Sequence, residues 1–269
     1  MSKREAYKEQ LSGLIAESLG TGVAENLMTY LTSNSNLPGP RGNLELADAF
    51  ADVVGDYEGD CEKLWSLCMQ LSRFSLVEAP VNNPKEFLVF CGARGVGALG
   101  TSPRFFQEAL SRLKKLASDA RWRTREGVAM ALQSMIARQS QKTLKELSRW
   151  IEGDNWLAMR AVAAGVAEPA LLKDEATVHA AFELHKQIFS RITVAGERRS
   201  SEFKTLRQGL GYSLSVVVRE VPKEGFAYMR QLAEQQDPDV LWIVKENLKK
   251  NRLLKSFPEE VASIKKLLN

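Results

Sequence analysis

One residue pattern recurs along this chain and limits the folds open to it. Around Arg125, an acid lies six residues before, an aromatic three before, and small or apolar residues four and seven after. Similar offsets surround Arg160, then Arg207 more loosely, then Lys245 on its N-terminal side. Successive anchors are 35, 47 and 38 residues apart, a spacing typical of arrays built from repeated helical units. We therefore expect a repetitive protein made of helices.

Apolar residues recur at helical spacing along nearly the whole chain, and the few β-branched runs sit inside such patterns. The sequence predicts about fourteen helices in antiparallel pairs joined by short turns. Capping patterns predict helix starts at Asn83, Thr143 and Asp154, among others. A regular run of such pairs is an α-solenoid, in which each pair buries one face on its neighbours.

The expected fold class is therefore all-α, a right-handed α-α superhelix forming one continuous domain. The predicted divisions of this domain are atypical N-terminal helices in residues 1–59, repeat pairs in 60–255 and a C-terminal capping helix in 256–269.

This layout resembles the HEAT repeat family, whose second helix begins with Asp and carries Arg or Lys about six residues later. The best-matching pairs are Asp119 with Arg125, Asp154 with Arg160, and Asp239 with Lys245. The resemblance covers roughly residues 60–255 and implies a HEAT-like solenoid in which acids and bases form a ladder between adjacent repeats. We therefore expect Arg125 and Arg160 to bond to Asp residues of their own or neighbouring repeats.

The chain is also similar in size, helix count and basicity to the HEAT-like DNA glycosylases of bacteria that act on alkylated bases. That family holds damaged DNA with Trp, Arg and Asp residues on a concave face. No residue of this chain is assigned to the family's catalytic Asp, so no catalytic residue is predicted. The resemblance implies DNA as an alternative partner.

The strongest functional signal is a cluster of Arg and Trp residues in the second helices of the predicted pairs. Guanidinium groups pair well with phosphates and indole faces stack on bases, but the same groups also serve as inter-repeat ion pairs and core aromatics. The candidate binding residues are Arg121, Trp122, Arg123, Arg125, Trp156, Arg160, Arg207, Trp242 and Lys245. Arg121 and Arg123 lie outside the ladder positions, so we expect their replacement to leave folding intact.

Other motifs indicate structure more than chemistry. Residues 32–42 read as a connector, with a binding loop as the alternative because Arg41 could meet an anion. The letters of a dinucleotide fingerprint at 95–100 lack a preceding strand, so Gly92, Gly95 and Gly97 are expected at close helix crossings. His185 lies in an apolar stripe and is expected in the core. The sequence predicts no metal site and no cofactor.

Composition bounds the function without naming it. Hydrophobic residues at 44%, charged residues at 26% and a formal charge of +4 are typical of a soluble globular protein and permit an anionic partner. The three cysteines, the charged N-terminus and the lack of a long apolar run favour a cytoplasmic location without membrane contact. We expect a non-enzymatic scaffold that binds a protein or peptide in its concave groove, with nucleic acid as the alternative partner.

Overall fold

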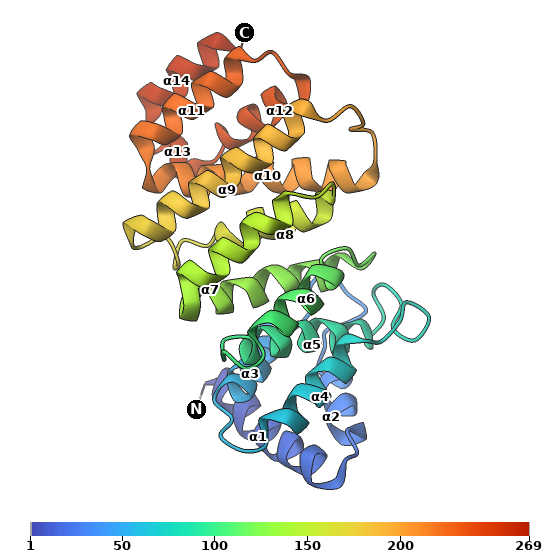
Figure 1. The fold of residues 1–269 in the computed structure, drawn as a ribbon. Helices are drawn as coiled ribbons and strands as arrows, with labels where there is room; N and C mark the ends of the chain where they lie inside the picture. Colours follow the sequence, from blue (N-terminus) through green and yellow to red (C-terminus); the bar gives the residue numbers. More distant parts are fainter. Residues whose placement is uncertain (1, 269) are drawn as a thin grey trace. The chain divides into compact units, whose positions relative to one another are not determined.

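The computed structural model describes residues 2–268, which form fourteen helices and no strand (Figure 1). The chain divides into two compact units, one ending at Arg138 and the other beginning at Gln139. The all-helical class and the helix count agree with the sequence prediction. No helix within the described residues is both long and apolar enough to span a bilayer.

The N-terminal unit is built around one buried helix. Its helices are α1 (Lys3–Thr21), α2 (Glu25–Ser33), α3 (Leu44–Gly55), α4 (Cys61–Ser72), α5 (Glu86–Leu99), α6 (Phe106–Leu116) and the first part of α7 (Trp122–Ile151). Every residue of α5 is buried, and the helix packs against α3, α4 and α6. Its nearly uniform apolar sequence therefore reflects contact on all sides.

Close helix crossings explain the glycines of α5. A Cβ atom on Gly92 would stand 2.3 Å from the Ser72 nitrogen of α4, and one on Gly97 would stand 2.4 Å from the Ala131 Cβ of α7. A Cβ on Gly95 would come within 2.6 Å of the Cys68 sulfur. These contacts confirm the prediction that the three glycines serve helix packing.

The C-terminal unit is a stack of helical hairpins. It contains the last turns of α7, then α8 (Trp156–Val166), α9 (Glu175–Val194), α10 (Ser201–Glu220), α11 (Pro222–Glu234), α12 (Pro238–Asn247), α13 (Asn251–Leu254) and α14 (Pro258–Leu267). Helix α10 packs on α8 and on α12, and the intervening α9 and α11 pack on α10 as well. This is the packing of successive helix pairs that the periodicity predicts.

Several predicted helix starts need correction. Helix α5 begins at Glu86 because residues after Asn83 first form a turn, in which the Asn83 side chain accepts from the Lys85 nitrogen at 2.9 Å. Thr143 lies inside α7, whose two halves meet at a non-helical Gln139. The cap of α8 is Asn155, whose side chain accepts from the Ala158 nitrogen at 2.9 Å, in place of Asp154.

His185 is a core residue of the C-terminal unit, as its apolar stripe predicts. The ring is fully buried, with Nδ1 2.9 Å from the Ala181 carbonyl and Nε2 2.9 Å from the Ser213 hydroxyl. Burial lowers the pKa of His185 to about 4. The imidazole is therefore neutral near pH 7 and serves packing.

Candidate functional site

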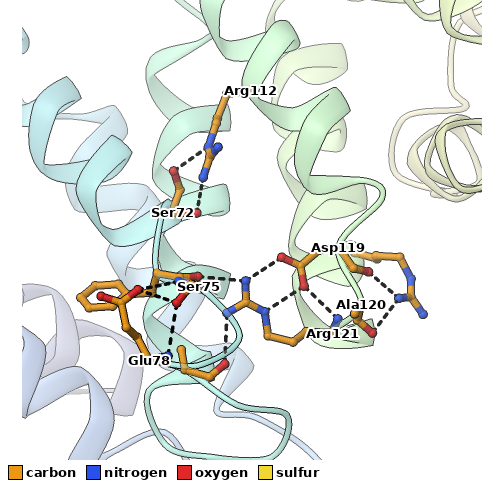
Figure 2. A network of polar contacts seen from close by, with 10 residues as sticks. Ser72, Ser75, Glu78, Arg112, Asp119, Ala120 and Arg121 are labelled. Carbon is orange, nitrogen blue, oxygen red and sulfur yellow. Dashed lines mark hydrogen bonds and ion pairs between the residues drawn. The ribbon is translucent and has the colours of Figure 1, made fainter.

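The segment that carries the repeated pattern opens α7 with a buried ion pair. The Asp119 carboxylate accepts from Arg121 twice, from Nε at 2.8 Å and from Nη2 at 2.6 Å (Figure 2). Only 3% of Arg121 is exposed. Such bidentate pairs fix the guanidinium plane, so Arg121 is held in one orientation.

The remaining donors of Arg121 hold the 73–85 connection between α4 and α5. Its Nη1 and Nη2 donate to the carbonyls of Ala79 and Phe74, each at 3.1 Å. Figure 2 also shows Arg112 of α6 donating to the hydroxyl and carbonyl of Ser72, at the end of α4. Arg121 therefore ties the connection to the start of α7, and Arg112 holds the end of α4 that leads into it.

Arg123 performs a similar task between two connections. It forms an ion pair with Glu86 at 3.1 Å, and it donates to the Gly39 carbonyl and to the Asn82 side chain. Asn82 in turn accepts from the Gly39 nitrogen at 3.0 Å. Arg123 thus joins the 34–43 connection to the 73–85 connection, and we call this set of residues the Arg123 junction.

The interior of the Arg123 junction is buried and incompletely paired. Glu86 is fully buried and 6% of Arg123 is exposed. Glu86 Oε2 also accepts from the Asn82 nitrogen at 2.6 Å, while Glu86 Oε1 and Arg123 Nε have no hydrogen-bond partner among the described residues. A buried charge without a partner lowers the stability of the fold, so the loss of either Glu86 or Arg123 should destabilise the unit.

These contacts correct the expectation that Arg121 and Arg123 lie free of structural pairing. Both guanidinium groups are buried in ion pairs, so neither presents its charge to a ligand in solution. The residue between them does face outward. Trp122 is 44% exposed, and the Arg123 guanidinium lies 4.6 Å from its ring. Trp122 is therefore an exposed aromatic residue whose two neighbours in the chain are held in place by ion pairs.

A cavity of about 220 Å³ opens beside Trp122. Its lining residues are Arg41, Gly42, Leu44, Phe87, Phe90, Trp122, Arg123, Glu126 and Met130. The Phe87 and Phe90 rings are stacked, with centroids 5.9 Å apart. For comparison, a dry apolar cavity of about 150 Å³ can hold benzene. The space is therefore large enough for an apolar side chain.

Two charged residues besides Arg123 line this cavity, which we call the Trp122 cavity. Arg41 is exposed and belongs to the 34–43 connection, where the sequence allowed a binding loop. It makes no hydrogen bond or ion pair with another described residue. Glu126 is partly exposed and already interacts with its surroundings. Arg41 is thus the cation at the cavity that is left for a ligand.

The ladder between acids and bases is present in part. Arg207 pairs with Asp239 of the next repeated copy at 2.8 Å, as a ladder between adjacent repeats requires. Asp154 pairs with Arg191 at 2.6 Å, and the Asp119 carboxylate is taken by Arg121. Arg125 donates to the backbone carbonyls of Asp119 and Ala120 at 2.7 and 3.1 Å. Each of these three Asp residues is in an ion pair, but Asp119 and Asp154 pair with Arg121 and Arg191, which are not anchor residues of the repeated pattern.

The other candidate residues lie in the C-terminal unit. Trp156 packs edge-on against Phe203 with ring centroids 5.3 Å apart, and the side chain of Arg160 passes beside Gly209. The Arg207 guanidinium lies 4.2 Å from the Trp242 ring, and Lys245 is exposed. The predicted cluster thus divides between the two units, and we treat its halves as two separate groups.

The sequence did not single out Tyr212, which is 50% exposed on α10. The Arg252 guanidinium lies 4.4 Å from its ring centroid and the Lys250 nitrogen 5.9 Å from it. The sequence feature that could have indicated this group is the basic run at 249–255. Tyr212 lies forty residues before Arg252. We call these three residues the Tyr212 cluster.

The described residues contain no group of three or more His, Cys, Asp or Glu side chains that could hold a metal ion. Burial raises the pKa of the Cys68 thiol to about 12, and it raises that of Cys91 well above the usual value. Neither thiol is a nucleophile near pH 7, since the thiolate is the reactive form.

No protein-family model matches the chain, and neither does any curated protein sequence. A search of solved structures finds similarity to a designed armadillo repeat protein, YIII(Dq)4CqI, at 15% sequence identity. The match covers 89% of this chain and 97% of that protein, with a TM-score of 0.28. A score of this size does not establish a shared fold, so the helical stacking described above rests on the contacts within each unit.

Proposed function

We propose that this chain is a non-enzymatic interaction protein that binds a peptide segment of a protein partner. In this proposal the Trp122 cavity receives an apolar side chain of the partner. The observation that carries it is an apolar cavity beside a half-exposed Trp, built on a buried ion-pair junction. A scaffold role for HEAT-like helix pairs is consistent with it.

The rigidity of the cavity supports binding over a structural role alone. Arg123 ties two segments that form it, the 34–43 connection and the start of α5, to the start of α7 before any partner arrives. A preformed cavity costs little conformational entropy on binding. Exposed Trp side chains next to such pockets frequently dominate binding energy, because they offer a large contact area with few rotatable bonds.

Selection from a random peptide library tests this proposal. The immobilised protein would be used for selection, with the Trp122→Ala variant as the counter-selection target. We expect enriched peptides to share an apolar residue and to bind at least tenfold more weakly to Trp122→Ala, as loss of an aromatic anchor implies. Val77→Ala is the matched control, since Val77 is 90% exposed in the same unit and lies outside the cavity.

Equal binding of the selected peptides to wild type and Trp122→Ala would refute the proposal. The same conclusion follows if the library yields no peptide that binds above background. The three cysteines are free thiols, as expected in a reducing compartment, so the selection should be run with reductant.

The Tyr212 cluster supports a second candidate, binding of single-stranded nucleic acid by the C-terminal unit. An exposed aromatic with Arg and Lys beside its ring combines a stacking platform with phosphate contacts. Contacts from Arg252, Lys250, Lys249 and Lys245 would give a log–log salt slope of about −3 for a single strand. Anisotropy of a labelled oligothymidine between roughly 50 and 200 mM salt measures this slope. Absence of binding at the lower salt concentration removes this candidate.

A further inference from the structure

Arg41 stands apart from the other arginines near the Trp122 cavity because it has no internal partner. Arg121 and Arg123 are buried in ion pairs with Asp119 and Glu86. Arg94 of α5 is buried as well and pairs with Asp48 at 2.7 Å. Arg41, by contrast, is exposed, and no described residue pairs with it. An ion pair used for folding therefore does not account for its position.

The backbone around Arg41 is fixed although its side chain is exposed. Within the 34–43 connection, the Ser35 carbonyl accepts from the Asn43 nitrogen at 2.9 Å, and the Ser35 hydroxyl accepts from the Leu37 nitrogen at 3.1 Å. Gly39 is held on both sides, since its nitrogen donates to Asn82 and its carbonyl accepts from Arg123. Arg41 is thus delivered to the cavity rim by a connection that is ordered before a ligand binds.

The charges around the cavity leave Arg41 as the exposed cation at its rim that has no ion-pair partner among the described residues. Glu86 neutralises Arg123 inside the junction. Glu126 is the other acid on the cavity wall, and it is engaged with its own surroundings. Glu45, next to Leu44 on the rim, faces Lys3 at 3.9 Å. A partner group that approaches the cavity beside Arg41 therefore gains most if it carries a negative charge.

We propose that the Trp122 cavity recognises an apolar residue adjacent to an acidic residue, Asp or Glu, in the partner peptide. The apolar side chain enters the space between Trp122, Phe87 and Phe90, and the carboxylate pairs with Arg41 at the rim. This inference rests on the proposed function and adds the charge of the partner to it. We choose an acidic side chain over a chain terminus because terminal carboxylates are captured by converging backbone donors, whereas the donor here is one exposed guanidinium.

Three capped dipeptides test the inference with one change of charge at a time. They are N-acetyl-Phe-Glu-amide, N-acetyl-Phe-Gln-amide and N-acetyl-Phe-Lys-amide. Binding to the full chain is followed by the indole N–H signals of the five Trp residues in nitrogen–proton NMR spectra, with Trp122 assigned through a Trp122→Phe variant. We expect the Trp122 signal to shift, with the Glu peptide binding about threefold to fivefold more tightly than the Gln peptide and the Lys peptide binding weakest.

The Arg41→Gln variant separates the charge effect from the cavity. It should bind the Glu and Gln peptides equally, while Arg73→Gln, which changes another exposed Arg of the same unit, should keep the wild-type order. Equal binding of all three peptides to the wild type would overturn the acidic preference and leave the apolar cavity in place. Preference for the Lys peptide would overturn it as well. If none of the peptides shifts the Trp122 signal, the inference and the proposed function both fail.

Discussion

Replacing Arg123 with Met should destabilise the N-terminal unit far more than an ordinary arginine substitution. The change removes the partner of Glu86, a carboxylate with no exposed surface, and leaves that charge buried. Breaking a buried pair on one side costs about 3–5 kcal/mol. The substitution also removes the donors to Gly39 and Asn82, which hold two connections together.

Urea unfolding measures this cost. With a denaturant slope of about 2 kcal/mol per molar, a loss of about 3–5 kcal/mol lowers the unfolding midpoint by about 1.5–2.5 M. Arg104→Met is the matched control, because Arg104 pairs with Glu62 at the surface of the same unit and both side chains are more than half exposed. An exposed pair contributes about 0–1 kcal/mol, so the control should move the midpoint by less than about 0.5 M.

A double variant tests whether the cost comes from the stranded charge. Glu86→Leu combined with Arg123→Met removes both charges, so it should be less destabilised than the sum of the two single variants by at least about 1.5 kcal/mol. Additive effects would refute the buried-pair argument. A midpoint for Arg123→Met equal to that of Arg104→Met would refute it too.

Two further predictions concern packing and pH. Gly97→Ala should cost about 1–3 kcal/mol of stability, because its Cβ would overlap Ala131. Gly13→Ala meets open space and should stabilise α1 by about 0.5–1 kcal/mol. Thermal melts that rank the two variants the other way would contradict the close crossing of α5 and α7. The pKa of His185 is near 6.5 in the unfolded chain but about 4 in the folded protein, so the unfolded state binds more protons between these pH values. The free energy of unfolding should therefore fall by up to about 3 kcal/mol as the pH drops through that window. His185→Gln should remove this part of the slope in urea titrations at pH 7 and pH 5, and an unchanged slope would contradict the assignment.

Local features of the fold could be predicted from the sequence because each depends on residues close together in the chain. Asp174 and Asp237 cap α9 and α12, and such caps can be recognised in a sequence because a short acidic side chain before a helix can accept from the first free N–H groups. The glycines of α5 were placed correctly because repeated loss of a side chain in an apolar helix indicates close packing.

The roles of Arg121 and Arg123 could not be predicted by the same reasoning. Their offsets within one helix placed them outside the ladder, but their partners Ala79 and Glu86 lie 42 and 37 residues earlier. The two guanidinium groups contact residues in or next to the 73–85 connection, and helical periodicity does not predict the path of a connection. Glu86 did carry a signal, as an acid at the first position of a nearly uniformly apolar helix, but the same residue suits a helix start.

The Trp122 cavity was also beyond sequence reasoning, although Trp122 and Arg41 had been singled out. Its walls come from α3, α5, α7 and the 34–43 connection, so it exists only once these segments pack. Phe87 and Phe90 belong to the buried helix α5. Only the packed structure shows that their rings also border an open space.

Isotope-filtered NMR on the complex of the labelled protein with a selected peptide tests most directly whether the Trp122 cavity holds an apolar side chain of the peptide. We predict nuclear Overhauser contacts between the apolar side chain of the peptide and the side chains of Trp122, Phe87 and Met130, which line the cavity. Contacts to Tyr212 in the C-terminal unit, with none to these three residues, would contradict this placement of the peptide.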